Sequence, residues 1–114
     1  MEAGHRAVAE HRDTAAETAW RAALADAERL GADDPHVFAP LDQLGALYAR
    51  TGRLEEAAPV LQRALALRQQ ILGADDPDVA ASLEAYATVL RKLGRTAEAE
   101  PLETRARAIR AKSQ

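Results

Sequence analysis

The chain has no cysteine among its 114 residues, and it has only one Trp, two Tyr and one Phe. The absence of cysteine excludes disulfide bridges, thiol nucleophiles and cysteine-ligated zinc sites. Strands favour aromatic and β-branched residues, whereas the 28 alanines and the many leucines favour helices that pack closely. Composition alone therefore predicts an all-helical protein, and the length limits it to one domain.

Long apolar runs are also missing. No run approaches the ~20 residues that a membrane span needs, and residues 1–13 carry charges and histidine where a signal peptide would be apolar. With a net charge of −3, the chain lacks the basic excess of a nucleic-acid-binding protein. We expect a soluble, cytoplasmic protein that binds neither membranes nor nucleic acids.

Residues that carry catalysis or bind metals are sparse. His5, His11 and His36 are too scattered to form a ligand cluster. The sequence has no glycine-rich phosphate loop, no dinucleotide fingerprint and no serine–histidine–acid arrangement. We expect no enzymatic activity, no cofactor and no metal.

An internal repeat organises the chain. Residues 30–35 (Leu-Gly-Ala-Asp-Asp-Pro) recur unchanged as residues 72–77, and Gly52-Arg53 recurs as Gly94-Arg95, so that both pairs of segments share the same 42-residue offset. A period in the range of roughly 20 to 50 residues indicates a solenoid of stacked helical units. The chain holds two full copies, preceded by the second half of a third.

Each copy contains the signals for two helices. Asp34 and Asp76 suit N-caps because a proline follows each, and apolar residues then recur at helical spacing until the stop glycines Gly52 and Gly94. Five helices are predicted in one domain, 13–114. Its parts are a half repeat (13–30), a first repeat (36–72) and a second repeat (78–112) with a polar capping helix, and an N-terminal segment (1–12) can continue the first helix.

Pro40 lies inside the predicted helix 36–51. Within a helix, the proline ring clashes with the carbonyl group four residues earlier. We therefore expect a bend or a late start of this helix at Pro40.

The order of residues within each copy resembles a tetratricopeptide repeat. The first copy has the family's large residues, a small residue for close helix crossing and a turn glycine, and the second copy follows the same order. The residues in the first copy are Leu41, Leu44, Gly45, Tyr48, Gly52, Ala57, Leu61 and Ala64, and those in the second are Leu83, Tyr86, Ala87, Leu90, Gly94, Ala99 and Ala106. The resemblance implies an α-solenoid of antiparallel helix pairs.

The length of the repeat is similar to that of the kinesin light chain type of this family, because it exceeds the roughly 34 residues of the common tetratricopeptide unit. Residues 63–68 (Arg-Ala-Leu-Ala-Leu-Arg) also resemble that type. The many alanines, with only 2 lysines among 15 basic residues, suggest a GC-rich bacterial genome.

The resemblance implies a concave groove, lined by the first helix of each pair, in which family members bind extended or helical peptides. Transferring the family's groove positions gives the candidate contact residues Asp42, Gln43, Ala46, Arg50, Glu84, Thr88, Arg91 and Lys92, with Ala39, Ala49, Ala81 and Ala85 beside them. Gln43 can hydrogen-bond a peptide backbone as the asparagines of kinesin light chain repeats do, and Ala85 cannot. The charges either recognise a ligand with a basic and an acidic stretch or follow the helix dipoles.

Trp20 aligns with the polar residues Gln62 and Thr104, so we expect it outside the repeat core. There it either anchors an interface or covers the half repeat. Since two and a half repeats fall short of the ~3 needed for a stable stack, two chains could dock as a homodimer. The candidate interface residues are Ala16, Trp20, Ala23 and Ala27.

The sequence thus leaves three hypotheses. The chain is a protein- or peptide-binding adaptor or scaffold, a self-associating structural module, or a regulatory subunit that acts only within a larger complex.

Overall fold

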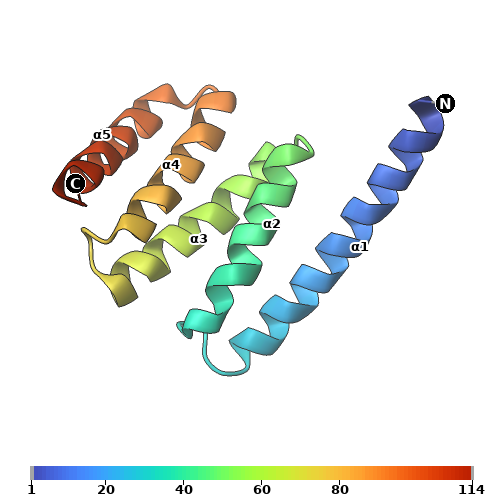
Figure 1. Cartoon of the computed structure of the whole chain (residues 1–114), viewed down its shortest axis with the longest axis horizontal. Helices are drawn as coiled ribbons and strands as arrows, with labels where there is room; N and C mark the ends of the chain where they lie inside the picture. The colour runs from blue at the N-terminus through green and yellow to red at the C-terminus, as the bar shows by residue number, and fades with distance from the viewer. Residues whose placement is uncertain (1, 114) are drawn as a thin grey trace.

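Five α-helices form a continuous row in the part of the chain that the structure describes. The structure, a computed structural model, describes the backbone of residues 2–113 and the side chains of residues 11–113, and within this range it contains no strand. The helices are α1 (Glu2–Glu28), α2 (Phe38–Arg50), α3 (Leu54–Leu72), α4 (Pro77–Lys92) and α5 (Thr96–Ser113). Each helix runs antiparallel beside the next, from α1 at one end of the row to α5 at the other (Figure 1). The architecture is the predicted all-α solenoid.

The repeated loops start their helices in the same way. Asp34 and Asp76 are both extended, with φ and ψ of −72° and 137° and of −71° and 138°. Each carboxylate accepts a hydrogen bond from the backbone N–H two residues on, at 2.9 Å from His36 and 2.8 Å from Asp78. Both aspartates are therefore N-caps, as predicted.

Pro40 delays the start of α2. A single turn of 3-10 helix, η1 (Pro35–Val37), follows the cap, and α2 begins only at Phe38. Pro40 then lies in the first turn of α2, where its missing N–H leaves no helical bond unmade. The predicted late start is confirmed, and α4, which has Ser82 at the corresponding position, begins directly at Pro77.

The core follows the row and is richest around α4. Leu44, Tyr48, Leu61, Leu83 and Leu90 are among the members of its main cluster, which α2, α3, α4 and α5 share. A smaller cluster joins α1, η1, α2 and α3 and contains Ala27, Val37, Leu41, Ala64 and Leu67. This packing holds α2 and α4 side by side over α3.

Candidate functional site

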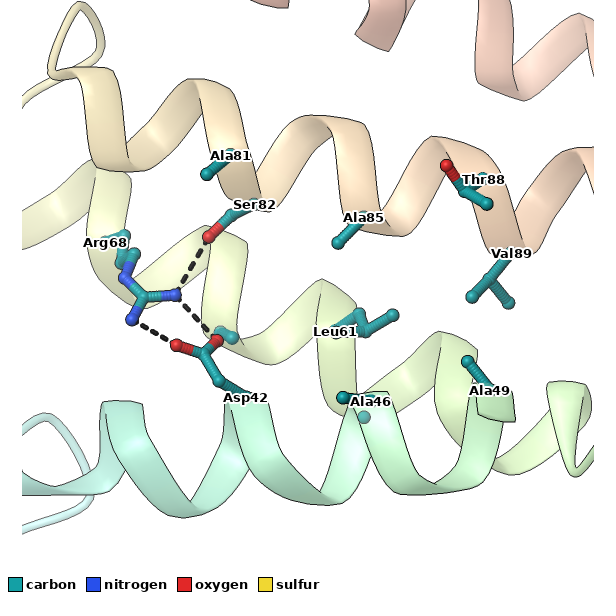
Figure 2. A pocket seen from close by; sticks show the side chains of 12 residues that line it. Asp42, Ala46, Ala49, Leu61, Arg68, Ala81, Ser82, Ala85, Thr88 and Val89 are labelled. Atoms are coloured by element: carbon teal, nitrogen blue, oxygen red, sulfur yellow. Dashed lines mark hydrogen bonds and ion pairs between the residues drawn. The ribbon is translucent and has the colours of Figure 1, made fainter. Parts of the chain in front are cut away.

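A groove of about 360 Å³ lies between α2, α3 and α4. Helices α2 and α4 form its two walls and α3 forms its floor (Figure 2). The lining residues are Asp42, Gly45, Ala46, Ala49, Leu61, Ala64, Arg68, Ala81, Ser82, Ala85, Thr88 and Val89. Because four of the wall residues are alanines and Gly45 has no side chain, the walls leave the floor around Leu61 open to a ligand.

A polar bridge closes one end of the groove (Figure 2). Arg68 of α3 donates hydrogen bonds to Asp42 Oδ1 at 2.7 Å and to Ser82 Oγ at 2.9 Å, and its second terminal nitrogen bonds Asp42 Oδ2. The guanidinium also lies 4.8 Å from the centroid of the Phe38 ring. The bond to Asp42 raises the pKa of Arg68. The bridge ties α2, α3 and α4 together, and the rest of the groove is apolar except for the Thr88 hydroxyl.

Three of the eight predicted contact residues, Asp42, Ala46 and Thr88, line this groove. So do the predicted neighbours Ala49, Ala81 and Ala85. The floor residues Leu61, Ala64 and Arg68 come from α3, and sequence reasoning missed their role because it transferred groove positions from first helices only. The sequence did contain a signal for Arg68. The 42-residue offset relates Asp42 to Glu84 and Arg68 to Arg110, so each repeat has an acidic residue in its first helix and an arginine in its second.

Gln43 and Arg50 lie elsewhere. They line a smaller hollow of about 140 Å³ between α1 and α2, together with Ala16, Trp20 and Leu47. Ala46 lines both cavities. Three predicted contact residues and two predicted interface residues thus meet in one hollow.

Three of the four other charged contact residues, Glu84, Arg91 and Arg50, pair within the chain. Glu84 accepts two hydrogen bonds from Arg110, at 2.5 and 2.8 Å, and Arg91 donates two to Glu103, both at 2.5 Å. These bonds lower the pKa of Glu84 and of Glu103. Arg50 pairs with Asp13 at 2.9 Å, while Lys92 is exposed in the last turn of α4.

The predicted interface residues lie on the side of α1 that faces α2. Ala27 is buried in the smaller core cluster, and Trp20 is half-buried against the main one. Ala16 and Ala23 are also half-buried. Trp20 therefore helps to cover the contact between α1 and α2.

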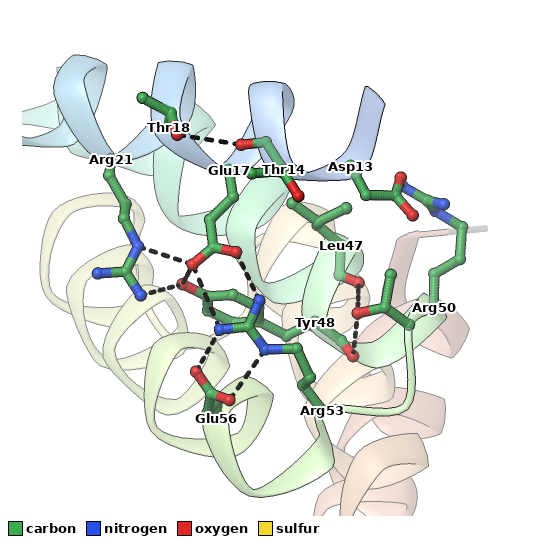
Figure 3. Close-up of polar contacts among 11 residues, drawn as sticks. Asp13, Thr14, Glu17, Thr18, Arg21, Leu47, Tyr48, Arg50, Arg53 and Glu56 are labelled. Atoms are coloured by element: carbon green, nitrogen blue, oxygen red, sulfur yellow. Dashed lines mark hydrogen bonds and ion pairs between the residues drawn. The ribbon is translucent and has the colours of Figure 1, made fainter. Parts of the chain in front are cut away.

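A network of charged residues holds α1 onto α2 (Figure 3). Glu17 accepts hydrogen bonds from Arg53 at 2.5 Å and from Arg21 at 2.9 Å, and Arg21 and Glu17 both bond the Tyr48 hydroxyl, at 3.0 and 3.3 Å. The Arg53 guanidinium stacks 4.4 Å from the centre of the Tyr48 ring and also binds Glu56. Chiefly through Arg53, this network lowers the pKa of Glu17.

Metal-ligating clusters and membrane-spanning helices are both absent from the described part of the chain. The side chains from residue 11 to 113 include no group of histidine and acidic residues that could hold a metal ion, and His5 lies outside them. None of the described helices is both long enough and apolar enough to span a bilayer.

A sequence model of the tetratricopeptide repeat family matches residues 7–70 and, again, residues 36–112. The chain belongs to the tetratricopeptide repeat family. The second match covers all the residues that line the groove between α2 and α4. Tetratricopeptide repeats generally mediate protein–protein interactions. No curated protein matches the chain.

Proposed function

We propose that the chain is a non-enzymatic adaptor or scaffold that binds a peptide segment of a protein partner in the groove between α2 and α4. The groove carries this proposal, because it presents apolar side chains from three helices around an open floor. An extended or helical segment bound there buries its own apolar side chains over Leu61 and Val89. The hydrophobic effect then supplies the affinity.

The polar groups of the groove favour a particular peptide. The Asp42 side chain is 38% exposed although it pairs with Arg68, so it keeps acceptor capacity for a peptide N–H or a basic side chain. Thr88 donates its hydroxyl proton to the Glu84 carbonyl and can still accept a hydrogen bond. We expect an aliphatic peptide with a basic residue near the Asp42 end.

The finer assignments belong to the same proposal. The 42-residue period supports the kinesin light chain type of repeat, and the composition supports a bacterial source. A cytoplasmic location, a chain without cofactor and a lack of nucleic-acid binding stay predictions from the sequence.

A phage-displayed library of short random peptides tests the proposal. Selection on the chain should enrich peptides with aliphatic residues. These peptides should bind the Ala85→Arg variant at least 10-fold more weakly, because Ala85 is an exposed wall residue and an arginine there fills the groove. Affinities are measured by fluorescence anisotropy with labelled peptides.

The control is Ala108→Arg, which places the same charge on an exposed position of α5. This variant should bind as the unmodified chain does. Enriched peptides that bind the Ala85→Arg variant unchanged would place recognition outside the groove.

The two alternatives, self-association through Ala16, Trp20, Ala23 and Ala27 and action within a larger complex, also stay predictions. The contact of these four residues with α2 in the same chain supports neither.

A further inference from the structure

Within the described part of the chain, one side of α1 has no helix packed on it. Helix α1 lies at the end of the row and contacts α2 on one side (Figure 1). On another side it exposes three alanines, Ala15, Ala19 and Ala22. We call these residues, with Asp26, the outer face of α1.

The repeat shows what such a face binds. The 42-residue offset places the outer face of α1 in register with a face of α3. The matching residues Ala57, Leu61 and Ala64 are 0%, 7% and 0% exposed. They are buried with residues of α2: Leu44 and Tyr48 share a cluster with Ala57 and Leu61, and Leu41 shares one with Ala64. The same face is therefore covered by a helix in one half of this molecule and open in the other.

We propose that the outer face of α1 binds a separate amphipathic helix of a partner protein, in the position that α2 takes on α3. This docking is independent of peptide binding in the groove between α2 and α4.

Side-chain size defines the partner. Helix α2 presents Leu41, Leu44 and Tyr48 to a face of α3 that has alanines on either side of Leu61. Since the outer face of α1 is small throughout, the complementary helix has large apolar residues at positions i, i+3 and i+7. Ala19 stands where α3 has Leu61, so the partner also has room for a side chain where α2 has Gly45.

A second copy of the chain fits this face poorly. Two alanine faces bury little apolar area when they meet, far less than a stable interface needs. The exposed large hydrophobic side chains of the described chain are Leu30, in the turn after α1, and Ile71 and Leu72, at the end of α3, and they do not form an i, i+3, i+7 row. A partner of different sequence is therefore favoured over a homodimer.

Charge defines the partner further. Arg68 of α3 pairs with Asp42 of α2, and the residue of α1 in register with Arg68 is Asp26. Asp26 pairs with Arg29 of its own helix, at 3.3 Å, and both side chains are more than two-thirds exposed, at 71% and 79%. So exposed a pair is weak. The partner helix should carry Lys or Arg where α2 has Asp42.

Docking would also complete a second groove. A helix on the outer face of α1 would stand beside Gln43, Ala46 and Leu47 of α2. These residues correspond to Ala85, Thr88 and Val89, which form the α4 wall of the groove beside α2. Gln43 would then line a groove with two walls.

A peptide derived from α2 tests the proposal. The probe is residues 36–51 with Asp42→Lys and Gly45→Leu, stapled on its solvent-facing side so that it is helical in isolation. The leucine fits opposite Ala19 and clashes with Leu61, which keeps the probe from replacing α2 on α3. Anisotropy of the labelled probe should show saturable binding to the full chain, weakened at least 10-fold by Ala19→Arg and unchanged by Ala108→Arg.

A charge exchange identifies the register. The same probe with Asp42 retained should bind the chain at least 10-fold more weakly than the Asp42→Lys form. The Asp26→Lys variant should reverse this preference. Circular dichroism verifies that each variant stays helical.

Three outcomes would overturn the proposal: no saturable binding, binding that Ala19→Arg leaves unchanged, or a preference that Asp26→Lys does not reverse. Light scattering of the chain alone measures its molar mass and so tests whether a second copy occupies the outer face of α1. A dimer that Ala19→Arg converts to monomer would assign the face to a second copy instead.

Discussion

At the scale of single residues, Gly45 shows how one side chain sets the distance between two helices. Gly45 is buried where α2 crosses α3, and a side chain there would collide with that of Leu61. Leu61 is the floor of the groove. The absence of a side chain at Gly45 therefore keeps α2 close to α3 and leaves Leu61 in place on the floor of the groove.

We predict that Gly45→Val lowers the free energy of unfolding by about 2 kcal/mol, the usual cost of overpacking. Helix propensity alone predicts a small gain, because valine is a better helix former than glycine. Urea denaturation followed by circular dichroism measures the change. Ala46→Val, at the next and exposed position, should cost less than about 1 kcal/mol. Equal costs for the two variants would mean that the crossing is not tightly packed.

The sequence predicted the small residue at Gly45 and the wall residues Ala46 and Thr88, because the resemblance to the family fixes which positions of each repeat are small and which face the groove. The partners of Glu84 and Arg91 could not be predicted in this way. Both charges pair with α5, through Arg110 and Glu103, and such pairs depend on how neighbouring helices are rotated against each other. A helix considered by itself shows only the dipole preference.

At the scale of elements, α1 depends on polar contacts more than the other helices do. Among its side chains from residue 11 onward, only Ala27 is buried, whereas α4 buries eight residues. Glu17, Arg53 and Tyr48 supply the connection that apolar burial does not. A helix attached in this way should respond to pH.

We predict that α1 detaches from α2 in acid. The folded-state pKa of Glu17 is lowered, so its contribution to stability is present above the ordinary pKa of glutamate, about 4.3, and is lost as pH falls through the lower folded pKa. Fluorescence of Trp20, the single tryptophan, reports the detachment because Trp20 lies against α2.

Glu17→Gln should weaken the attachment at neutral pH and flatten this acid transition. Glu55→Gln, at an exposed position of α3, should leave the transition unchanged. A transition of equal size in the Glu17→Gln variant would assign the pH dependence to other carboxylates.

Most helix boundaries could be predicted from the sequence, since caps and glycine stops are local signals. The late start of α2 followed from Pro40 for the same reason. The side of α1 that contacts α2 could not be predicted. The sequence offered Ala16, Trp20, Ala23 and Ala27 as a dimer interface, and in the structure this side of α1 faces α2. Which side of a helix is left open depends on the neighbour that is present.

At the scale of the whole molecule, stability should fall from α4 outward. Helix α4 packs against both α3 and α5, and α1 packs on one side only. We predict that hydrogen exchange at neutral pH is slowest for the amides of residues 79–90 and at least 100-fold faster for those of residues 13–26, because the latter open without global unfolding. Mass spectrometry of peptic fragments gives both rates. Uniform protection along the chain would instead show that the five helices unfold as one unit.

The loops that lead into α2 and α4 have matching structures, which determines how the chain can be lengthened. Asp34 and Asp76 adopt nearly identical backbone angles and make the same capping bond, so the chain enters α2 and α4 through matching connectors. Residues 31–72 are thus a cassette with compatible ends. A duplicate inserted between Leu72 and Gly73 would lengthen the protein by one helix pair. Each added cassette would also add one more groove between neighbouring first helices, so the length of the row is adjustable in units of 42 residues.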